Sequence, residues 1–342
     1  MCDAPILKNR ARVMGFAAVY IMLFHFFTGI YKDLHIPVVT AVLKCGNVGV
    51  DSFLFLSGIG LFFSLSKDRG TLSFYRRRFT RVMIPALVIS LPYFFVNDIL
   101  MKHRSVLTFF EDWSTLSFWT HGNKSVWFVS LLVVLYLVYP LIFRIQQKRS
   151  VFVLLLAAAA FAGVTAMFFF APEHYNKHEI ALTRIPVFLI GSLTGEMLHD
   201  AEQKKKRIGP AVIVYTVLSL ILFAASFVWN KTDRNTAFML YRFGSGGAGV
   251  LLSMLAAWLP ERLVPAPAER CLKTLGGITL ELYLVHVFMM NLIKVMGWGE
   301  GRGTGIYLLI IAAAITASLL LTFAAVWFLR RIHAVPAPKP KS

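Results

Sequence analysis

Three residues that can take part in proton transfer, His25, Asp51 and His286, stand inside long apolar stretches of the sequence. Ionisable side chains are rare within membrane spans because burying them in hydrocarbon is unfavourable, so each one is a functional candidate. A neutral imidazole can accept a proton from a hydroxyl group. A carboxylate beside it would orient the imidazole and stabilise its protonated form. These residue types point to acid–base chemistry inside a membrane.

The positions of the three residues predict similar depths. His25 lies twelve residues after Val13, where the first apolar run begins, which is about 18 Å along a helix. Asp51 lies about 22 Å from the inner end of the second run, and His286 lies about 14 Å along the ninth. The three side chains could therefore converge on one site. Two simpler interpretations stay open: a neighbouring helix can satisfy His25, and Asp51 can interact with a helix dipole.

Four arginines, Arg76, Arg77, Arg78 and Arg81, follow the second apolar run at the end opposite to Asp51. A carboxylate at one membrane face and guanidinium groups at the other indicate a site for an anionic ligand. Arg78 and Arg81 are three residues apart, so they face the same way on a helix. Paired guanidinium groups bind phosphate through bidentate hydrogen bonds. The alternative is that this cluster only fixes the orientation of the chain in the membrane.

The composition excludes an ordinary water-soluble domain. The 342 residues are 57% hydrophobic and 15% charged, which leaves too few charges to coat a soluble surface. The net charge of +18 sits in short clusters between apolar runs, so we expect membrane lipids as partners and no nucleic acid. Three scattered cysteines and the pair His174 and His178, which has no third ligand nearby, give no metal-binding pattern. We expect no bound metal.

Ten apolar runs of spanning length predict an all-α, polytopic integral membrane protein. The sixth run is short and is interrupted by Gly191 and Gly195. Lys and Arg are concentrated in alternate connecting segments, so the positive-inside rule places both termini in the cytoplasm. We expect one ten-helix domain over residues 1–332 and a disordered Pro- and Lys-rich tail over residues 333–342. The predicted spans are residues 13–31, 47–66, 82–101, 126–143, 151–171, 183–198, 209–229, 236–259, 277–296 and 304–329.

One long segment between spans, residues 102–125, has apolar residues at three- and four-residue steps. This periodicity is typical of an amphipathic helix at the membrane interface or of a lid over the outer mouth of the protein. Its Trp113 and Trp119 are equally consistent with an aromatic belt at the membrane surface.

The stretch from Gly46 to Pro85 resembles the membrane-bound acyltransferase 3 family. The second span of that family reads Gly-Val-Asp, an aromatic residue and Leu-Ser-Gly, and an Arg-x-x-Arg motif precedes the third. The matching residues here are Gly49, Val50, Asp51, Phe55, Leu56, Ser57, Gly58, Arg78 and Arg81. Ser57 has no nucleophile elbow around it, and Ser-Gly in a membrane helix favours close packing.

Further matches follow in the expected order along nearly the whole chain. The first span has the family's histidine in a Gly-x-Ala setting, and Met14 stands where many members carry an arginine. Either Arg12 or Arg10 substitutes for that arginine from the preceding turn, or the contact that the family's arginine makes is missing here. The matching residues of the first span are Gly15, Ala17 and His25. Beyond Pro85, the matches are Trp127-Phe128 with Tyr136 and Pro140, then Arg184 to Gly191, then Leu282 to His286.

The resemblance implies transfer of an acyl group, commonly acetyl, from acyl-coenzyme A to a hydroxyl of a carbohydrate or another cell-surface acceptor, such as a lipid-linked glycan or polysaccharide. It implies catalytic roles for His25 and Asp51, with His25 as the general base. Arg78 and Arg81 would bind the phosphates of acyl-coenzyme A. The chain would be a multi-pass protein of the cell membrane, most simply a bacterial plasma membrane.

Four further residues are candidates for binding the acceptor: Trp127, Arg184, Glu281 and His286. For Arg184, the alternative is an anchor at the membrane interface. For Glu281, the alternative is a structural ion pair with Arg242 or with another charge.

Two other classes of function remain open. A transporter or flippase for a lipid-linked or polymeric glycan would also use many spans with intramembrane charges, but it would not need a deep histidine together with an inner arginine pair. A non-catalytic assembly or sensor subunit is favoured by Met14.

Overall fold

The computed structural model describes residues 4–29, 37–67, 70–199, 203–298 and 304–332. The secondary structure in these ranges is helical, and they contain no strand, so the all-α prediction is confirmed. The predicted disordered tail, residues 333–342, lies outside the described residues.

The predicted spans correspond to helices of the structure. Among the described residues, nine helical stretches are long and apolar enough to cross a membrane, and a tenth forms if two helices bent by 84° count as one span. The spanning helices are α2 (Arg10–Gly29), α4 (Val48–Leu65), α5 (Thr71–Phe94) with η1 (Phe95–Met101), α8 (Trp127–Lys148), α9 (Val151–Phe170), α10 (Pro172–Leu182) with α11 (Ile185–His199), α12 (Gln203–Trp229), α13 (Arg234–Trp258) and α16 (Thr304–Arg331). The bent pair is α14 (Ala266–Gly277) with α15 (Thr279–Val295). A polytopic membrane protein with about ten spans is thereby confirmed.

Shorter helices connect these elements. They are α1 (Pro5–Lys8), α3 (Pro37–Lys44), α6 (Val106–Trp113), α7 (Ser117–His121) and the 3-10 turn η2 (Glu261–Leu263).

The chain forms two compact units, each assembled from separated stretches of sequence. Unit 1 comprises Met1–Ala17, Asn47–Phe74 and Val134–Gly276. Unit 2 comprises Ala18–Gly46, Tyr75–Val133 and Gly277–Ser342. Helices α2, α5 and α8 each contribute residues to both units.

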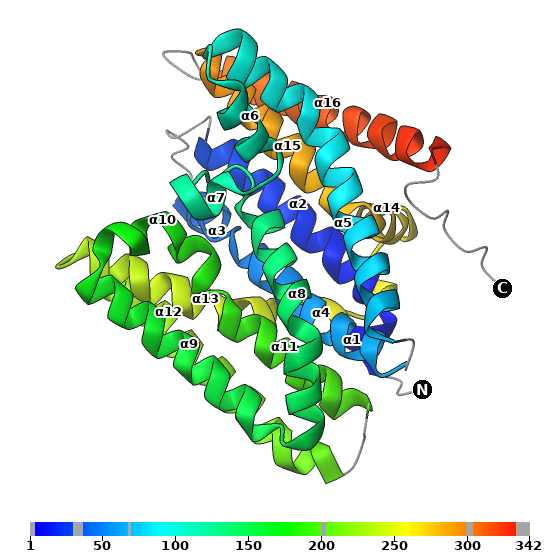
Figure 1. The fold of residues 1–342 in the computed structure, drawn as a ribbon, viewed down its shortest axis with the longest axis vertical. Coiled ribbons are helices and arrows are strands. Elements are labelled where there is room, and N and C mark those ends of the chain that lie inside the picture. The colour runs from blue at the N-terminus through cyan, green and yellow to red at the C-terminus, as the bar shows by residue number, and fades with distance from the viewer. Residues whose placement is uncertain (1–3, 30–36, 68–69, 200–202, 299–303, 333–342) are drawn as a thin grey trace. The chain divides into compact units, whose positions relative to one another are not determined.

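In unit 1, α4 packs against α11 and α13, and α12 runs beside α13 (Figure 1). Glycines allow the backbones of α4 and α11 to approach closely. A Cβ atom added to Gly58 would lie 2.2 Å from the carbonyl oxygen of Phe188, and one added to Gly191 would lie 2.1 Å from that of Phe55. The glycines that interrupt the sixth predicted span are therefore packing sites, and the Ser57-Gly58 pair lies at the close helix contact that its sequence favours.

Arg12 closes the C-terminal end of α13 within unit 1. The last carbonyl groups of a helix lack partners inside it, and a guanidinium group there also interacts favourably with the helix dipole. The Nη2 atom of Arg12 donates hydrogen bonds to the carbonyl oxygens of Ala256, Ala257 and Leu259, at 2.8 to 3.1 Å. Its Nη1 atom lies 3.4 Å from Glu269. The Arg12 side chain therefore binds the C-terminal end of α13.

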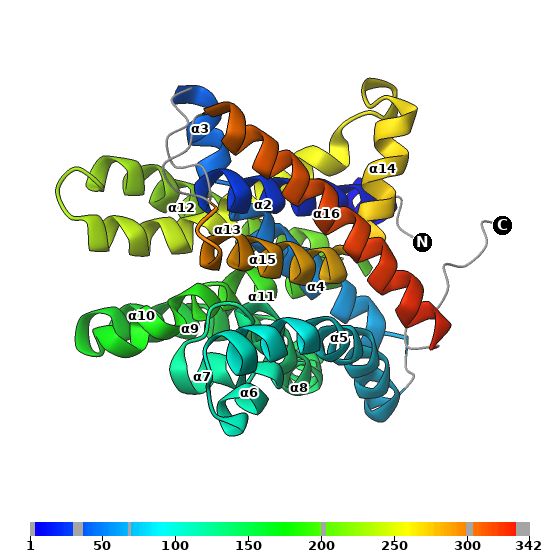
Figure 2. The same ribbon diagram turned by 90° about the horizontal axis from the view of Figure 1, so that it is seen from above.

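In unit 2, α15 and α16 lie side by side (Figure 2). The segment 102–125 forms α6 and α7, as its periodicity partly predicted. The indole nitrogen of Trp113 donates a hydrogen bond of 2.8 Å to the carbonyl oxygen of Leu87 on α5. The hydroxyl of Ser130 on α8 donates one of 2.7 Å to the carbonyl oxygen of Thr115. These bonds fasten the segment to two helices of unit 2.

Candidate active site

Two histidines from distant parts of the sequence meet in unit 2. The Nδ1 atom of His25, on α2, lies 2.8 Å from the Nε2 atom of His286, on α15. Their ring centroids are 5.1 Å apart and the ring planes differ by 25°. The structure thus brings these two predicted residues together.

The backbone of α15 determines which ring nitrogen carries the proton in each neutral histidine. The Nδ1 atom of His286 lies 2.7 Å from the carbonyl oxygen of Leu282. A carbonyl oxygen only accepts hydrogen bonds, so this Nδ1 atom donates and Nε2 keeps the lone pair. The Nδ1 atom of His25 must then donate to His286. The Nε2 atom of His25 is left with its lone pair, as a general base requires.

The setting of the histidine pair is aromatic. His286 is 2% exposed, whereas His25 is only partly buried. The rings of Phe26 and Tyr283 meet the His286 ring edge to face, with centroids 6.4 and 5.8 Å away, and Phe24 lies 5.1 Å from His25. Such a setting disfavours charged imidazole. The more accessible member of the pair is the one whose free nitrogen can take a proton.

Glu281, on the helix α15 that carries His286, interacts with arginines of two other helices of unit 2. It lies in the first turn of α15, is buried, and interacts electrostatically with Arg81 of α5 and Arg330 of α16. Because Glu281 precedes His286 by five residues, the two lie about 7.5 Å apart along the helix axis. Arg78 is partly buried and Arg81 is exposed. The predicted phosphate-binding arginines and the histidine pair thus belong to one unit, and α15 carries both Glu281, which interacts with Arg81, and His286.

Asp51 has a different partner from the histidines. It lies in unit 1, where its Oδ1 atom is 3.2 Å from the Nε atom of Arg184, and both side chains are buried. Nearby charges in this unit include Arg242, whose Nε atom lies 2.8 Å from Glu179. Two carboxylates and two guanidinium groups therefore balance one another inside unit 1. Arg242 pairs with Glu179, which is one of the alternatives that the sequence left open.

Trp127 begins α8 in unit 2 and is buried. It lies beside Phe128, with ring centroids 5.7 Å apart, and Phe128 in turn lies 5.1 Å from Tyr283. This chain of aromatic rings leads from Trp127 to the histidine pair.

Several charged residues that were not predicted as site residues are buried in the structure. They are Asp98 and Asp112 of unit 2, which both lie near Arg104, and Glu179 of unit 1, which pairs with Arg242. Asp98 falls within the third predicted span, so the rule that singled out His25 applied to it as well. Glu179 precedes the sixth predicted span and gave no such signal.

The family comparison covers almost the whole chain. The model of the acyltransferase 3 family, described as an acyltransferase domain, matches residues 14–327. The chain belongs to the acyltransferase 3 family. It is thus an acyltransferase of the membrane type, and both histidines, Asp51 and the arginine pair lie inside the matched region. Neither the curated proteins nor the solved structures contain a match to it.

Unit 2 contains two features that bear on acyl transfer. One is the Nε2 atom of His25, which keeps its lone pair when both histidines are neutral. The other is a group of guanidinium side chains one and a half helical turns away along α15. Arg12, one of the two substitutes considered for the arginine missing at Met14, is bound to α13.

Proposed function

We propose that this acyltransferase moves an acyl group, most simply acetyl, from acyl-coenzyme A to a hydroxyl of a carbohydrate or lipid-linked glycan. The observation that carries the proposal is the hydrogen-bonded series from His25 through His286 to the carbonyl oxygen of Leu282. This series holds the His25 ring in the tautomer that can accept a proton at Nε2. A purely structural histidine would not need a second buried histidine to fix its tautomer.

The reaction proceeds by attack of the hydroxyl oxygen on the thioester carbonyl carbon. His25 accepts the hydroxyl proton at Nε2, and the new C–O bond forms as the C–S bond breaks. The same proton passes from His25 to the thiolate of coenzyme A, so the enzyme ends in its starting state. His286 accepts the hydrogen bond from Nδ1 of the imidazolium and stabilises its charge.

Arg78 and Arg81 are the proposed donor-binding residues. Guanidinium groups bind phosphate through paired charge-assisted hydrogen bonds, and coenzyme A carries several phosphate charges. The pantetheine arm would then follow α15 from the arginines toward the histidine pair. Glu281, beside Arg81, limits the positive charge at this end of unit 2.

For the acceptor, Trp127 offers an aromatic face close to the ring series that contacts His286. Arg184 and Asp51 remain predicted substrate-binding and catalytic residues. Their ion pair within unit 1 is what supports a joint role. We also propose that the chain lies in a bacterial plasma membrane with both termini in the cytoplasm, because its basic segments favour that side.

The second candidate function is a transporter or flippase for a lipid-linked or polymeric glycan. It is favoured by the two ion pairs of unit 1, Asp51 with Arg184 and Glu179 with the partly buried Arg242, because intramembrane ion pairs also occur in substrate pathways.

One experiment separates the two functions. Purified protein in detergent is incubated with radiolabelled acetyl-coenzyme A and a carbohydrate acceptor, with His25→Ala as the comparison. Acyltransferase function predicts thioester turnover that depends on His25. Transport would be favoured if no short acyl donor were turned over and if a glycan crossed the membrane of vesicles that contain the protein.

A further inference from the structure

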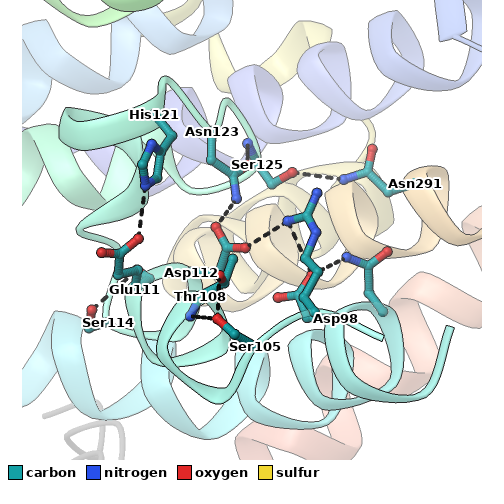
Figure 3. Close-up of polar contacts among 12 residues, drawn as sticks. Asp98, Ser105, Thr108, Glu111, Asp112, Ser114, His121, Asn123, Ser125 and Asn291 are labelled. Carbon is teal, nitrogen blue, oxygen red and sulfur yellow. Dashed lines mark hydrogen bonds and ion pairs between the residues drawn. The ribbon is translucent and has the colours of Figure 1, made fainter. Parts of the chain in front are cut away.

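A second group of polar side chains lies at the other end of α15 from Glu281. We call it the polar cluster, and it consists of Asn97, Asp98, Arg104, Asp112, Asn123, Ser125 and Asn291. All of these residues belong to unit 2. Figure 3 shows Asn123 pointing to Asp112 of α6 and Asn291 of α15 pointing to Ser125.

The contacts within the polar cluster are well defined. Asp112 accepts hydrogen bonds from Arg104, at 3.2 Å, and from the side-chain amide of Asn123. The Oδ1 atom of Asp98 accepts a bond of 2.7 Å from Asn97 and lies 3.5 Å from Arg104. The amide of Asn291 donates to Ser125, at 3.2 Å. The cluster therefore joins α15 to the segment that precedes α8.

The charges of the polar cluster do not balance. Asp98 and Asp112 are 0% and 2% exposed, and the guanidinium group of Arg104 is the one cation bound to them among the described residues. The Oδ2 atom of Asp98 is buried without a hydrogen-bond partner. Buried carboxylates without enough partners are unfavourable. In unit 1, by contrast, two carboxylates face two guanidinium groups.

Two buried carboxylates that share one guanidinium group leave the polar cluster with a net negative charge, and the Oδ2 atom of Asp98 can accept a hydrogen bond from a ligand, so the cluster has the character of a binding site. Its orphan oxygen requires a donor such as O–H or N–H. Arg104, whose side chain is 42% exposed, and the partly exposed Asn123, Ser125 and Asn291 lie around the buried carboxylates. Amide, guanidinium and carboxylate groups together bind ligands that carry several hydroxyls. Among the described residues, no group of three or more His, Cys, Asp or Glu side chains could hold a metal ion.

Aromatic rings connect the polar cluster to the histidine pair. Tyr93 on α5 interacts electrostatically with Asn291 and Ser125, and its ring stacks on Phe288 with centroids 4.1 Å apart. Phe288 is two residues beyond His286, and Asn291 is five residues beyond it, or about 7.5 Å along the axis. Along α15, the order is thus Glu281 with the arginines, then the histidine pair, then the polar cluster.

We infer that the polar cluster is an acceptor subsite, which binds a sugar ring that is neutral or positively charged and rejects one that is anionic. The inference rests on the proposed function for the hydroxyl acceptor, and it adds the residues and the charge preference. The orphan oxygen of Asp98 accepts a hydrogen bond from the ligand, and the net negative charge of the cluster repels a carboxylate or phosphate on the ring.

Glucose, glucosamine and glucuronate test the charge preference, because they share a ring and differ in charge. Binding to the full-length protein in detergent at pH 7 is measured by saturation-transfer NMR without any acyl donor. The expected order of affinity is glucosamine, then glucose, then glucuronate. Asp98→Asn should weaken the binding of glucose and glucosamine about tenfold or more, as expected for loss of a charge-assisted hydrogen bond.

Two more variants guard against a simple folding defect. Glu111→Gln is the matched control, because Glu111 bonds to the exposed His121 and makes no described contact with the buried carboxylates. It should leave the affinities unchanged. Arg104→Gln changes a half-exposed side chain and makes the cluster more negative, so it should increase the preference for glucosamine over glucose.

The outcomes distinguish this inference from the proposed function. Equal binding of the three sugars, or equal binding by the Asp98→Asn and Glu111→Gln variants, would overturn the subsite even if His25-dependent thioester turnover is observed. Binding of Ca²⁺ that depends on Asp98, with no sugar bound, would overturn it as well. The expected order of sugars with no thioester turnover would support the subsite and count against acyl transfer.

Discussion

The Nδ1 atom of His25 donates a hydrogen bond to the Nε2 atom of His286, 2.8 Å away, because the other nitrogen of His286 is bound to the carbonyl oxygen of Leu282. The backbone of one helix thereby determines which nitrogen of a side chain on another helix is free. This relationship separates the roles of the two histidines and makes them testable.

His25→Ala should reduce acyl transfer by about 10²- to 10⁴-fold, the usual contribution of a general base. His286→Phe keeps an aromatic ring but removes the acceptor for the Nδ1 proton of His25, so kcat should fall at least about tenfold while the KM for the donor is unchanged. Steady-state kinetics measures both. A variant of His286 with full kcat would show that the hydrogen bond has no part in catalysis.

Replacing both Arg78 and Arg81 by Gln should raise the KM for acetyl-coenzyme A, and the difference from the natural protein should shrink at high salt because the attraction is electrostatic. Glu281→Gln should act in the opposite direction and lower this KM, because it removes the negative charge beside Arg81 and Arg330. If KM were unchanged in both variants, the arginines would not bind the donor, and their role would be to orient the chain in the membrane.

Asp51→Asn should destabilise the protein by about 3–5 kcal/mol, because it leaves the buried guanidinium group of Arg184 without its charge partner. The double variant Asp51→Asn with Arg184→Gln should recover part of this loss in thermal unfolding. Activity then tests the predicted catalytic role of Asp51. If the double variant were stable and transferred acyl groups normally, the pair of Asp51 and Arg184 would have a structural role and no catalytic one.

Gly58→Ala should destabilise unit 1 by roughly 1–3 kcal/mol, because the added methyl group would meet the backbone of Phe188. Gly163→Ala is the matched control on α9, since a Cβ atom there has no other atom within 4 Å. The two variants are compared by thermal unfolding in detergent. Equal transition temperatures would contradict the close contact between α4 and α11.

The spans could be predicted from the sequence because they depend on the pattern along a single helix, and helix rise alone allowed His25 and His286 to lie at one level. Charge partners could not, because they depend on which helix faces meet. Glu281 was a candidate partner for Arg242, yet the structure binds Arg242 to Glu179 and places Glu281 near Arg81.

Asp98 shows a second reason for missing residues. It lies in η1, a π-helical continuation of α5. Patterns read at 3.6 residues per turn do not reveal a π-helix, and π-helical turns often occur at functional sites. The rule for ionisable residues within spans would have selected Asp98, but its contacts with Asn97 and Arg104 could be known only from the structure.

Six of the seven residues of the polar cluster come from one continuous stretch, residues 97–125, while Asn291 is carried by α15. Neither histidine and none of the inner arginines belongs to that stretch. A single recombination event could therefore replace it as a cassette. Members of the family could in this way evolve new acceptors while the machinery for the thioester is inherited unchanged.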